Sequence, residues 1–173
     1  MPMKKHILSI LAITTIASAA YGCSGCEEKD DEKAILKLIE NGILLAEQHK
    51  AGKVMDLATD NFTAMPGNKS TEETNNMLVY AFMRYGKFRI KCPEPKIDIT
   101  SMDTAHVKIP FIVLREGGLI PDLSKLASDP EQWVSEAGKT ADPYYLELWL
   151  VKTGDGWRVD KARIDGIRPL EEI

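Results

Sequence analysis

Few residues of this sequence combine a reactive side chain with a spacing that indicates a particular chemistry. One of its three histidines, His6, lies in the export segment described below, and the other two, His49 and His106, are too few for a multi-histidine metal site. The chain contains no Gly-x-Ser-x-Gly, no phosphate-binding glycine loop and no His-Glu-x-x-His. The acidic stretch 27–32 lacks the spacing and the turn glycine of a calcium loop. Motifs therefore predict no catalytic residue, no metal and no cofactor.

The three cysteines allow several interpretations. Cys23 and Cys26 form a Cys-x-x-Cys pair, but a redox pair is expected between a strand and a helix, and a zinc site needs further ligands at suitable spacing. If Cys23 carries a lipid, Cys26 and Cys92 are the remaining partners for a disulfide. An oxidising compartment permits that bond, and two separate thiols fit the sequence equally well.

The first 22 residues have the pattern of a signal peptide. Lys4 and Lys5 form a basic start, and residues 7–20 are an uncharged, mostly apolar run. A transmembrane helix needs about 20 apolar residues, so this run is too short to span a bilayer. The pattern predicts export of the chain.

Two processing sites compete at the end of this segment. Ala17-Ser18-Ala19 satisfies the small-x-small rule for ordinary cleavage, whereas Ala20-Tyr21-Gly22-Cys23 resembles a bacterial lipobox. Residues 23–31 are small or charged and are expected to form a flexible tether, which favours lipidation at Cys23. We therefore expect a lipid-anchored protein of the bacterial envelope; a soluble periplasmic or secreted protein is the alternative.

Composition limits the class of domain that follows. The chain has 173 residues, 44% of them hydrophobic, which is enough for one domain with a substantial core. Its net charge is −4, and the first 22 residues contain two lysines and no acid. A domain this acidic is a poor candidate for nucleic-acid binding, which depends on basic patches.

Periodicity predicts helices followed by strands within one domain, residues 32–173. Expected helices cover residues 32–50, 53–58 and 70–85, and Ser70 with Glu73 forms a capping box at the start of the third. Residues 59–67 are expected to be irregular or a short strand, and further strands are expected over residues 88–92, 96–101, 104–115, 144–153 and 157–165. The last two are joined by Gly154-Asp155-Gly156, a hairpin signal. The long excursion between the strands ending at 115 and starting at 144 is typical of a functional loop.

The last hairpin carries a family resemblance. Tyr144–Val151 (YYLELWLV), then KTGDG, then Trp157–Ile164 (WRVDKARI) resembles the final hairpin of the nuclear transport factor two-like superfamily, which includes ketosteroid-isomerase-like and polyketide-cyclase-like proteins. The opening helix, residues 52–62 and the helix ending at Tyr85 resemble its first half. The resemblance implies an α+β fold in which three N-terminal helices pack on a curved antiparallel sheet, a cystatin-like cone with an apolar pocket. Fold alone does not choose between isomerisation, cyclisation, dehydration, binding and dimerisation.

An isomerase of this superfamily needs a carboxylate base and acidic donors in an apolar pocket. Asp60, Tyr85, His106 and Tyr144 are the possible parts in this sequence. Asp60 is equally well explained as turn chemistry, and Tyr85 as a core aromatic residue. His106 alternates with the apolar residues Ala105 and Val107 of its strand, so its side chain is expected on the other, outer face of the sheet.

The expected function is therefore non-catalytic binding. We expect the cone pocket to hold a small apolar ligand, or the domain to bind an envelope protein partner; an isomerase-, cyclase- or dehydratase-like enzyme is the alternative. A homodimer through the outer sheet face, around Trp149 and Val151, is a further possibility. The residues expected to contact a ligand are Phe62, Tyr85, Phe111, Trp133 and Tyr144, with Trp133 on a lid formed by the excursion. Met77 is also expected to point inward, and Trp157 to be a core residue.

Overall fold

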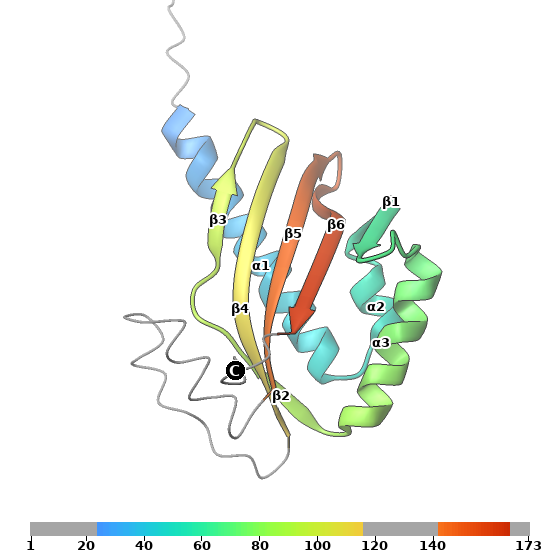
Figure 1. Ribbon diagram of the computed structural model, residues 1–173. Coiled ribbons are helices and arrows are strands. Elements are labelled where there is room, and N and C mark those ends of the chain that lie inside the picture. Colours follow the sequence, from blue (N-terminus) through green and yellow to red (C-terminus); the bar gives the residue numbers. More distant parts are fainter. Residues whose placement is uncertain (1–23, 116–141, 167–173) are drawn as a thin grey trace, which may run out of the picture.

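The computed structural model describes residues 24–115 and 142–166, which form three helices and a six-stranded sheet (Figure 1). The helices are α1 (Ser24–Glu47), α2 (Ala51–Met55) and α3 (Thr71–Tyr85). No helix in these ranges is long and apolar enough to cross a membrane. The long expected excursion and the N-terminal segment lie outside the described residues.

The first helix begins earlier than the sequence predicted. Its start is Ser24, so the stretch 24–31, which was expected to be a flexible tether, belongs to α1. Asp31 explains why this part of the chain joins the domain. Its carboxylate is buried and accepts a hydrogen bond from Trp157 Nε1 at 2.9 Å, and Lys152 Nζ lies 2.7 Å from the same oxygen. Asp31 therefore joins α1 to the last hairpin.

The third helix begins and ends as its sequence indicates. The Ser70 hydroxyl accepts from the backbone N–H of Glu73, and the Glu73 carboxylate accepts from the backbone N–H of Ser70, so the expected capping box is confirmed. Gly86 ends the helix with a φ of 63°, a conformation that favours glycine.

The sheet has the order β1-β6-β5-β4-β2, with β3 also paired to β4. Its strands are β1 (Ala58–Met65), β2 (Phe88–Lys91), β3 (Lys96–Ile99), β4 (Thr104–Arg115), β5 (Asp142–Thr153) and β6 (Gly156–Gly166). The expectation of a purely antiparallel sheet is wrong, because β1 pairs with β6 in parallel. The segment 59–67, expected to be irregular or a short strand, contributes to β1 between α2 and α3, so the three helices do not all precede the sheet as the resemblance implied. The α+β class and the curved sheet are confirmed.

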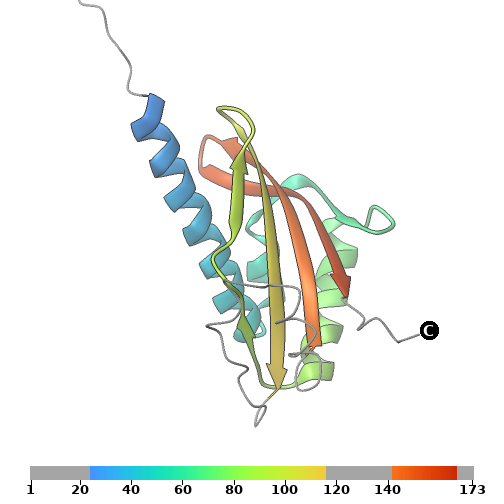
Figure 2. The same cartoon turned by 60° about the vertical axis from the view of Figure 1, so that its left-hand side comes forward.

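One face of the sheet carries the core and faces the helices, as Figures 1 and 2 show. Because β4 and β5 pair in continuous register, Val107 and Leu148 stand opposite one another on this inner face. They belong to a buried cluster with Ile35 and Ile39 of α1, and with Trp157, which is 6% exposed. The prediction that Trp157 is a core residue is confirmed.

Candidate functional site

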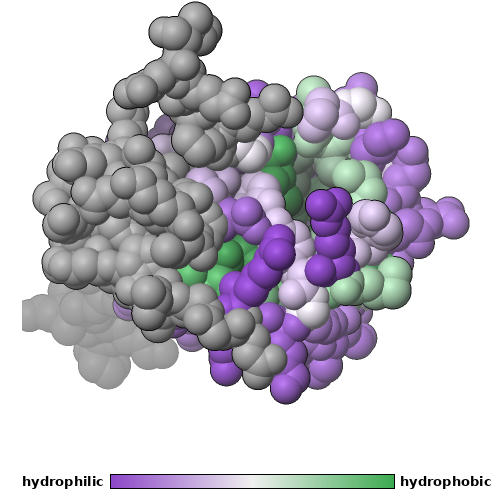
Figure 3. Space-filling model, turned by 60° about the horizontal axis from the view of Figure 1, so that its bottom comes forward, coloured by the Kyte–Doolittle hydropathy of each residue, from purple (hydrophilic) through white to green (hydrophobic). Residues whose placement is uncertain are grey.

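A cavity of about 370 Å³ lies between the inner face of the sheet and the three helices. This is within the range of small-molecule sites. Figure 3 views the molecule with the lower end of Figure 1 turned forward; hydrophilic residues border a hollow on this face, and hydrophobic residues are visible at its base. All three helices and five of the strands contribute to the wall: Leu38, Ile39, Gly42, Ile43, Ala46, Val54, Met55, Leu57, Ala58, Phe62, Thr74, Leu78, Ala81, Phe82, Tyr85, Phe88, Ile90, Cys92, Ile109, Phe111, Val113, Tyr144, Leu146, Leu148, Val159, Ala162 and Ile164.

Strand parity and helix periodicity explain why this wall is apolar. Alternate residues of β4 and β5 point inward, so Ile109 and Leu146, a directly opposed pair, both reach the cavity. On α1 the lining positions recur at steps of three and four residues, which keeps them on one side of the helix. Gly42 is one of these positions. A Cβ added there would meet Leu57 Cδ1 at 3.6 Å, so the glycine leaves room beside the cavity that a larger residue would occupy.

Four of the residues expected to contact a ligand line this cavity. They are Phe62 of β1, Tyr85 of α3, Phe111 of β4 and Tyr144 of β5. Their placement agrees with the expectation, and ligand contact itself stays a prediction. Trp133 and the lid lie outside the described residues.

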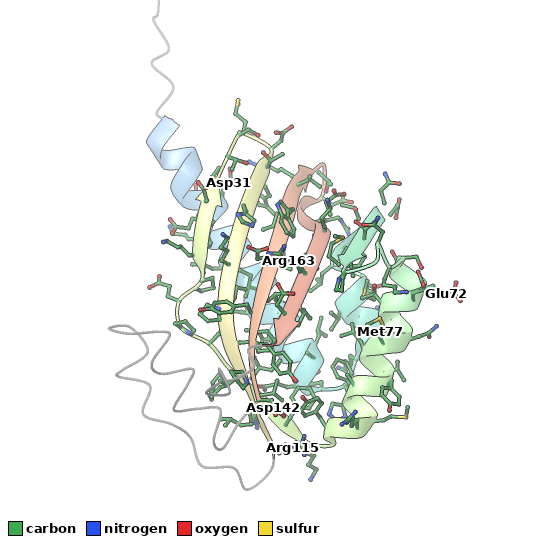
Figure 4. The ribbon with its side chains drawn as sticks, viewed as in Figure 1. Asp31, Glu72, Met77, Arg115, Asp142 and Arg163 are labelled. Atoms are coloured by element: carbon green, nitrogen blue, oxygen red, sulfur yellow. The ribbon has the colours of Figure 1, made fainter. Side chains whose placement is uncertain are left out.

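Met77 does not point into the cavity, contrary to the expectation. Its exposed fraction is 58%, and Figure 4 shows it on the flank of α3 that faces β6. The inward stripe of α3 instead passes through Thr74, Leu78, Ala81 and Tyr85. Helical spacing alone did not identify the centre of this stripe, because Met77 is adjacent to Leu78 and apolar as well.

Two tyrosine hydroxyls meet in the cavity wall. The hydroxyl of Tyr85 is hydrogen-bonded to that of Tyr144, although 59 residues separate them in the chain. The ring of Tyr144 stacks on Phe111 with centroids 5.4 Å apart, which holds it against β4. Burial, the Tyr144 hydroxyl and the nearby Asp142 carboxylate raise the pKa of Tyr85 above its ordinary value. The Tyr85 hydroxyl therefore keeps its proton throughout the physiological range.

A charged pair lies beside these hydroxyls without lining the cavity. Arg115 Nη2 is 3.4 Å from Asp142 Oδ2, and the Arg115 guanidinium carbon lies 5.0 Å from the centre of the Tyr85 ring. Figure 4 shows Arg115 and Asp142 together where β4 ends and β5 begins. Arg115 is thus already paired with a carboxylate.

The wall formed by the described residues contains no charged side chain, and its only side-chain polar groups are those of Thr74, Tyr85, Cys92 and Tyr144. Sequence reasoning missed Thr74 and Cys92. The Thr74 hydroxyl oxygen is buried without a hydrogen-bond partner among the described residues. Burial raises the pKa of the Cys92 thiol, which keeps it in its neutral form. The step of four residues from Thr74 to Leu78 is the signal that would have placed Thr74 on the inner stripe.

The other candidate catalytic residues lie elsewhere. Asp60 is exposed on β1. His106 lies on the outer face of the sheet, as expected, where its ring stacks on Trp149 with centroids 5.0 Å apart. Among the described residues no group of three or more histidine, cysteine, aspartate or glutamate side chains is arranged to hold a metal ion.

The outer face of the sheet around Glu147 and Trp149 is cross-linked by ion pairs. Glu147 Oε2 lies 2.5 Å from Arg163 Nη2, and Glu147 Oε1 lies 3.4 Å from Lys108 Nζ. The Nζ atom of Lys161 lies over the ring of Trp149, 5.7 Å from its centre. Figure 4 shows Arg163 on this face, away from the helices. The apolar cavity therefore lies on the inner face of the sheet, and these ion pairs lie on the opposite face.

Comparisons with known proteins identify the fold. No protein-family model matches the chain, and no curated protein matches it in sequence. Solved structures do match. An NTF2-like protein with a cystatin-like fold from Novosphingobium aromaticivorans has a TM-score of 0.59 at 14% identity, covering 85% of this chain and 88% of that one. A protein of unknown function with a cystatin-like fold from Nostoc punctiforme has a TM-score of 0.60 at 11% identity, covering 82% and 94%.

A ketosteroid isomerase-like protein from Erwinia carotovora atroseptica matches in the same way, with a TM-score of 0.57 at 16% identity, covering 81% of this chain and 98% of that one. At these identities the likeness concerns the fold alone. Together with the curved sheet and the helices on its inner face, these comparisons show that the chain has the NTF2-like, cystatin-like fold.

Proposed function

We propose that this protein is a binding domain that holds an uncharged, apolar small molecule in the cavity between the sheet and its helices. The observation that carries the proposal is the part of the wall that the described residues form, which is apolar except for two hydroxyl-bearing tyrosines, a threonine and a neutral thiol. Burying apolar ligand surface against such a wall is favourable at roughly 25 cal/mol per Å². A charged ligand would lose its hydration against this wall, and none of the described lining residues offers it a partner of opposite charge.

The catalytic alternative, an isomerase-, cyclase- or dehydratase-like enzyme, requires a base that touches its substrate. The described wall offers no carboxylate and no histidine for that role. Asp60 and His106, which the sequence suggested, lie on an exposed edge and on the outer face. Both placements support binding over catalysis.

Filling part of the cavity should weaken ligand binding. Ala81 is a lining residue of α3, and Ala81→Phe would place a ring in the space that a ligand occupies. In fluorescence titrations of the purified protein with the uncharged probe N-phenyl-1-naphthylamine, we expect saturable binding by the wild type and about tenfold weaker binding, or more, by Ala81→Phe, since overpacking removes the volume.

Ala34 provides the matched control. It is also a helical alanine, but it is exposed on α1, so Ala34→Phe should bind the probe as the wild type does. Circular dichroism would verify that both variants keep their helices. Equal binding by the wild type and Ala81→Phe would show that the probe binds elsewhere and would contradict the proposal.

We further propose that the domain is tethered to the bacterial envelope through a lipid on Cys23. The support is the sequence: a basic start, an apolar run and a small residue before the cysteine. Cys23→Ala should release the protein from the membrane fraction or block its processing, and mass spectrometry of the mature N-terminus is the measurement. A mature protein that begins at Ala20 or Tyr21 without an added acyl mass would refute the anchor.

A further inference from the structure

We infer that the hydroxyl pair of Tyr85 and Tyr144 is the polar anchor of the cavity and selects ligands that carry an uncharged oxygen group, a hydroxyl or a ketone, over the corresponding carboxylates and hydrocarbons. This inference rests on the proposed function and specifies the chemical class of its ligand.

The first argument is the position of the pair. Both tyrosines line the cavity, and each is half-buried, on a different element: Tyr85 in the last turn of α3 and Tyr144 near the start of β5. Each hydroxyl has one proton and can also accept hydrogen bonds, so a bonded pair still has capacity for a third oxygen. The rest of the described wall is almost wholly apolar. A ligand oxygen therefore forms more favourable hydrogen bonds at the tyrosine pair than anywhere else along this wall.

The second argument is the fixed geometry of the pair. Tyr144 is held by stacking on Phe111, and Tyr85 by the edge of the Phe88 ring, with centroids 6.1 Å apart. The Arg115 guanidinium covers the other part of the Tyr85 ring. Both hydroxyls are therefore oriented before a ligand arrives, which lowers the entropy lost on binding.

The third argument is charge. The carboxylate of Asp142 interacts with the Tyr85 hydroxyl from outside the cavity, and the guanidinium of Arg115, which lies against the Tyr85 ring, is already paired with that carboxylate. The described wall itself contributes no positive charge. A ligand carboxylate at the hydroxyl pair would be desolvated close to another carboxylate, whereas an alcohol or a ketone would meet only hydrogen-bonding groups.

The experiment uses three bicyclic ligands of similar shape. At neutral pH 2-naphthol carries a hydroxyl, 2-methylnaphthalene a methyl group and 2-naphthoate a carboxylate at the same ring position. Displacement of N-phenyl-1-naphthylamine from the purified protein gives their affinities. We expect 2-naphthol to bind about tenfold more tightly than either of the others, which is the effect of roughly one additional hydrogen bond.

Two variants and one control assign this preference to the pair. Tyr85→Phe and Tyr144→Phe should each reduce the preference for 2-naphthol to about twofold or less, while 2-methylnaphthalene binds as tightly as before, which also shows that the cavity is intact. Tyr145→Phe is the control and should leave the preference for 2-naphthol unchanged. Tyr145 is next to Tyr144 in sequence, but its side chain lies on the opposite face of β5.

Three outcomes would overturn the inference: equal binding of all three ligands, tighter binding of 2-naphthoate, or a preference that survives both substitutions. In each case binding of 2-methylnaphthalene by the wild type would leave the proposed function standing. If the folded wild type binds neither the probe nor any of the three ligands, the proposed function itself is wrong.

Discussion

Replacing Trp157 by alanine should lower the free energy of unfolding by about 3–5 kcal/mol, as is usual for a large buried aromatic side chain. The ring is 6% exposed and belongs to the cluster that joins α1 to the sheet. Its indole N–H also donates to Asp31 Oδ1, so the substitution removes one hydrogen-bond donor from that buried carboxylate. Urea denaturation followed by circular dichroism measures the change.

Trp149 is the matched control for this prediction. It lies half-buried on the outer face of β5, where it contacts His106 and Lys161, and it does not belong to the buried cluster that contains Trp157. Trp149→Ala should therefore cost only about 1–2 kcal/mol. Equal losses for the two tryptophans, or a loss at Trp157 below about 1 kcal/mol, would show that the cluster does not hold the domain together.

Asp31→Ala should lower the free energy of unfolding by about 2–3 kcal/mol, because it leaves a buried indole N–H without this acceptor and removes one ion-pair partner of Lys152. Asp30, the preceding residue, has a side chain that is 80% exposed and forms only a 3.7 Å pair with Lys33. Asp30→Ala should change the stability by less than about 0.5 kcal/mol. Thermal or urea unfolding of both variants gives the comparison.

The stabilisation by Asp31 should depend on pH in a defined direction. The hydrogen bond from Lys152, then that from Trp157, lowers the pKa of Asp31 below its ordinary value of 3.8. A carboxyl group with a lowered pKa in the folded state stabilises that state above its unfolded pKa, and this contribution is lost as the pH falls through the folded value. The wild type should therefore exceed Asp31→Ala by a constant amount near neutral pH and lose this advantage in acid. A difference that stays constant below pH 3.8 would contradict this account.

Much of the fold follows from local patterns in the sequence. The parity of the apolar positions along β4 and β5 placed Phe111 and Tyr144 on the inner face, and no bulge between the two strands disturbs that parity. The capping box at Ser70 and the turn after Thr153 were recognisable for the same reason, since a few adjacent residues determine them.

Features that depend on contacts between distant segments were not predictable. The parallel pairing of β1 with β6 places Ala58 opposite Val159, and the sequence of neither strand indicates whether the pairing is parallel or antiparallel. From the sequence alone, Asp31 belongs to an acidic tether. Its role becomes evident only from its contacts with Trp157 and Lys152 in the structure. The cavity wall also depends on contacts between distant segments, because Tyr85 of α3 meets Tyr144 of β5 although 59 residues separate them in the chain.

The most direct test of the central claim is to locate a bound ligand by NMR. With N-phenyl-1-naphthylamine bound to the purified protein, intermolecular NOEs should connect the probe to methyl groups of Ile109, Leu146 and Leu148, which face the cavity. No NOE should reach Val151 on the outer face of the sheet or the exposed Met83 of α3. NOEs to Val151 or Met83, with none to the three cavity residues, would contradict the assignment of this cavity as the binding site.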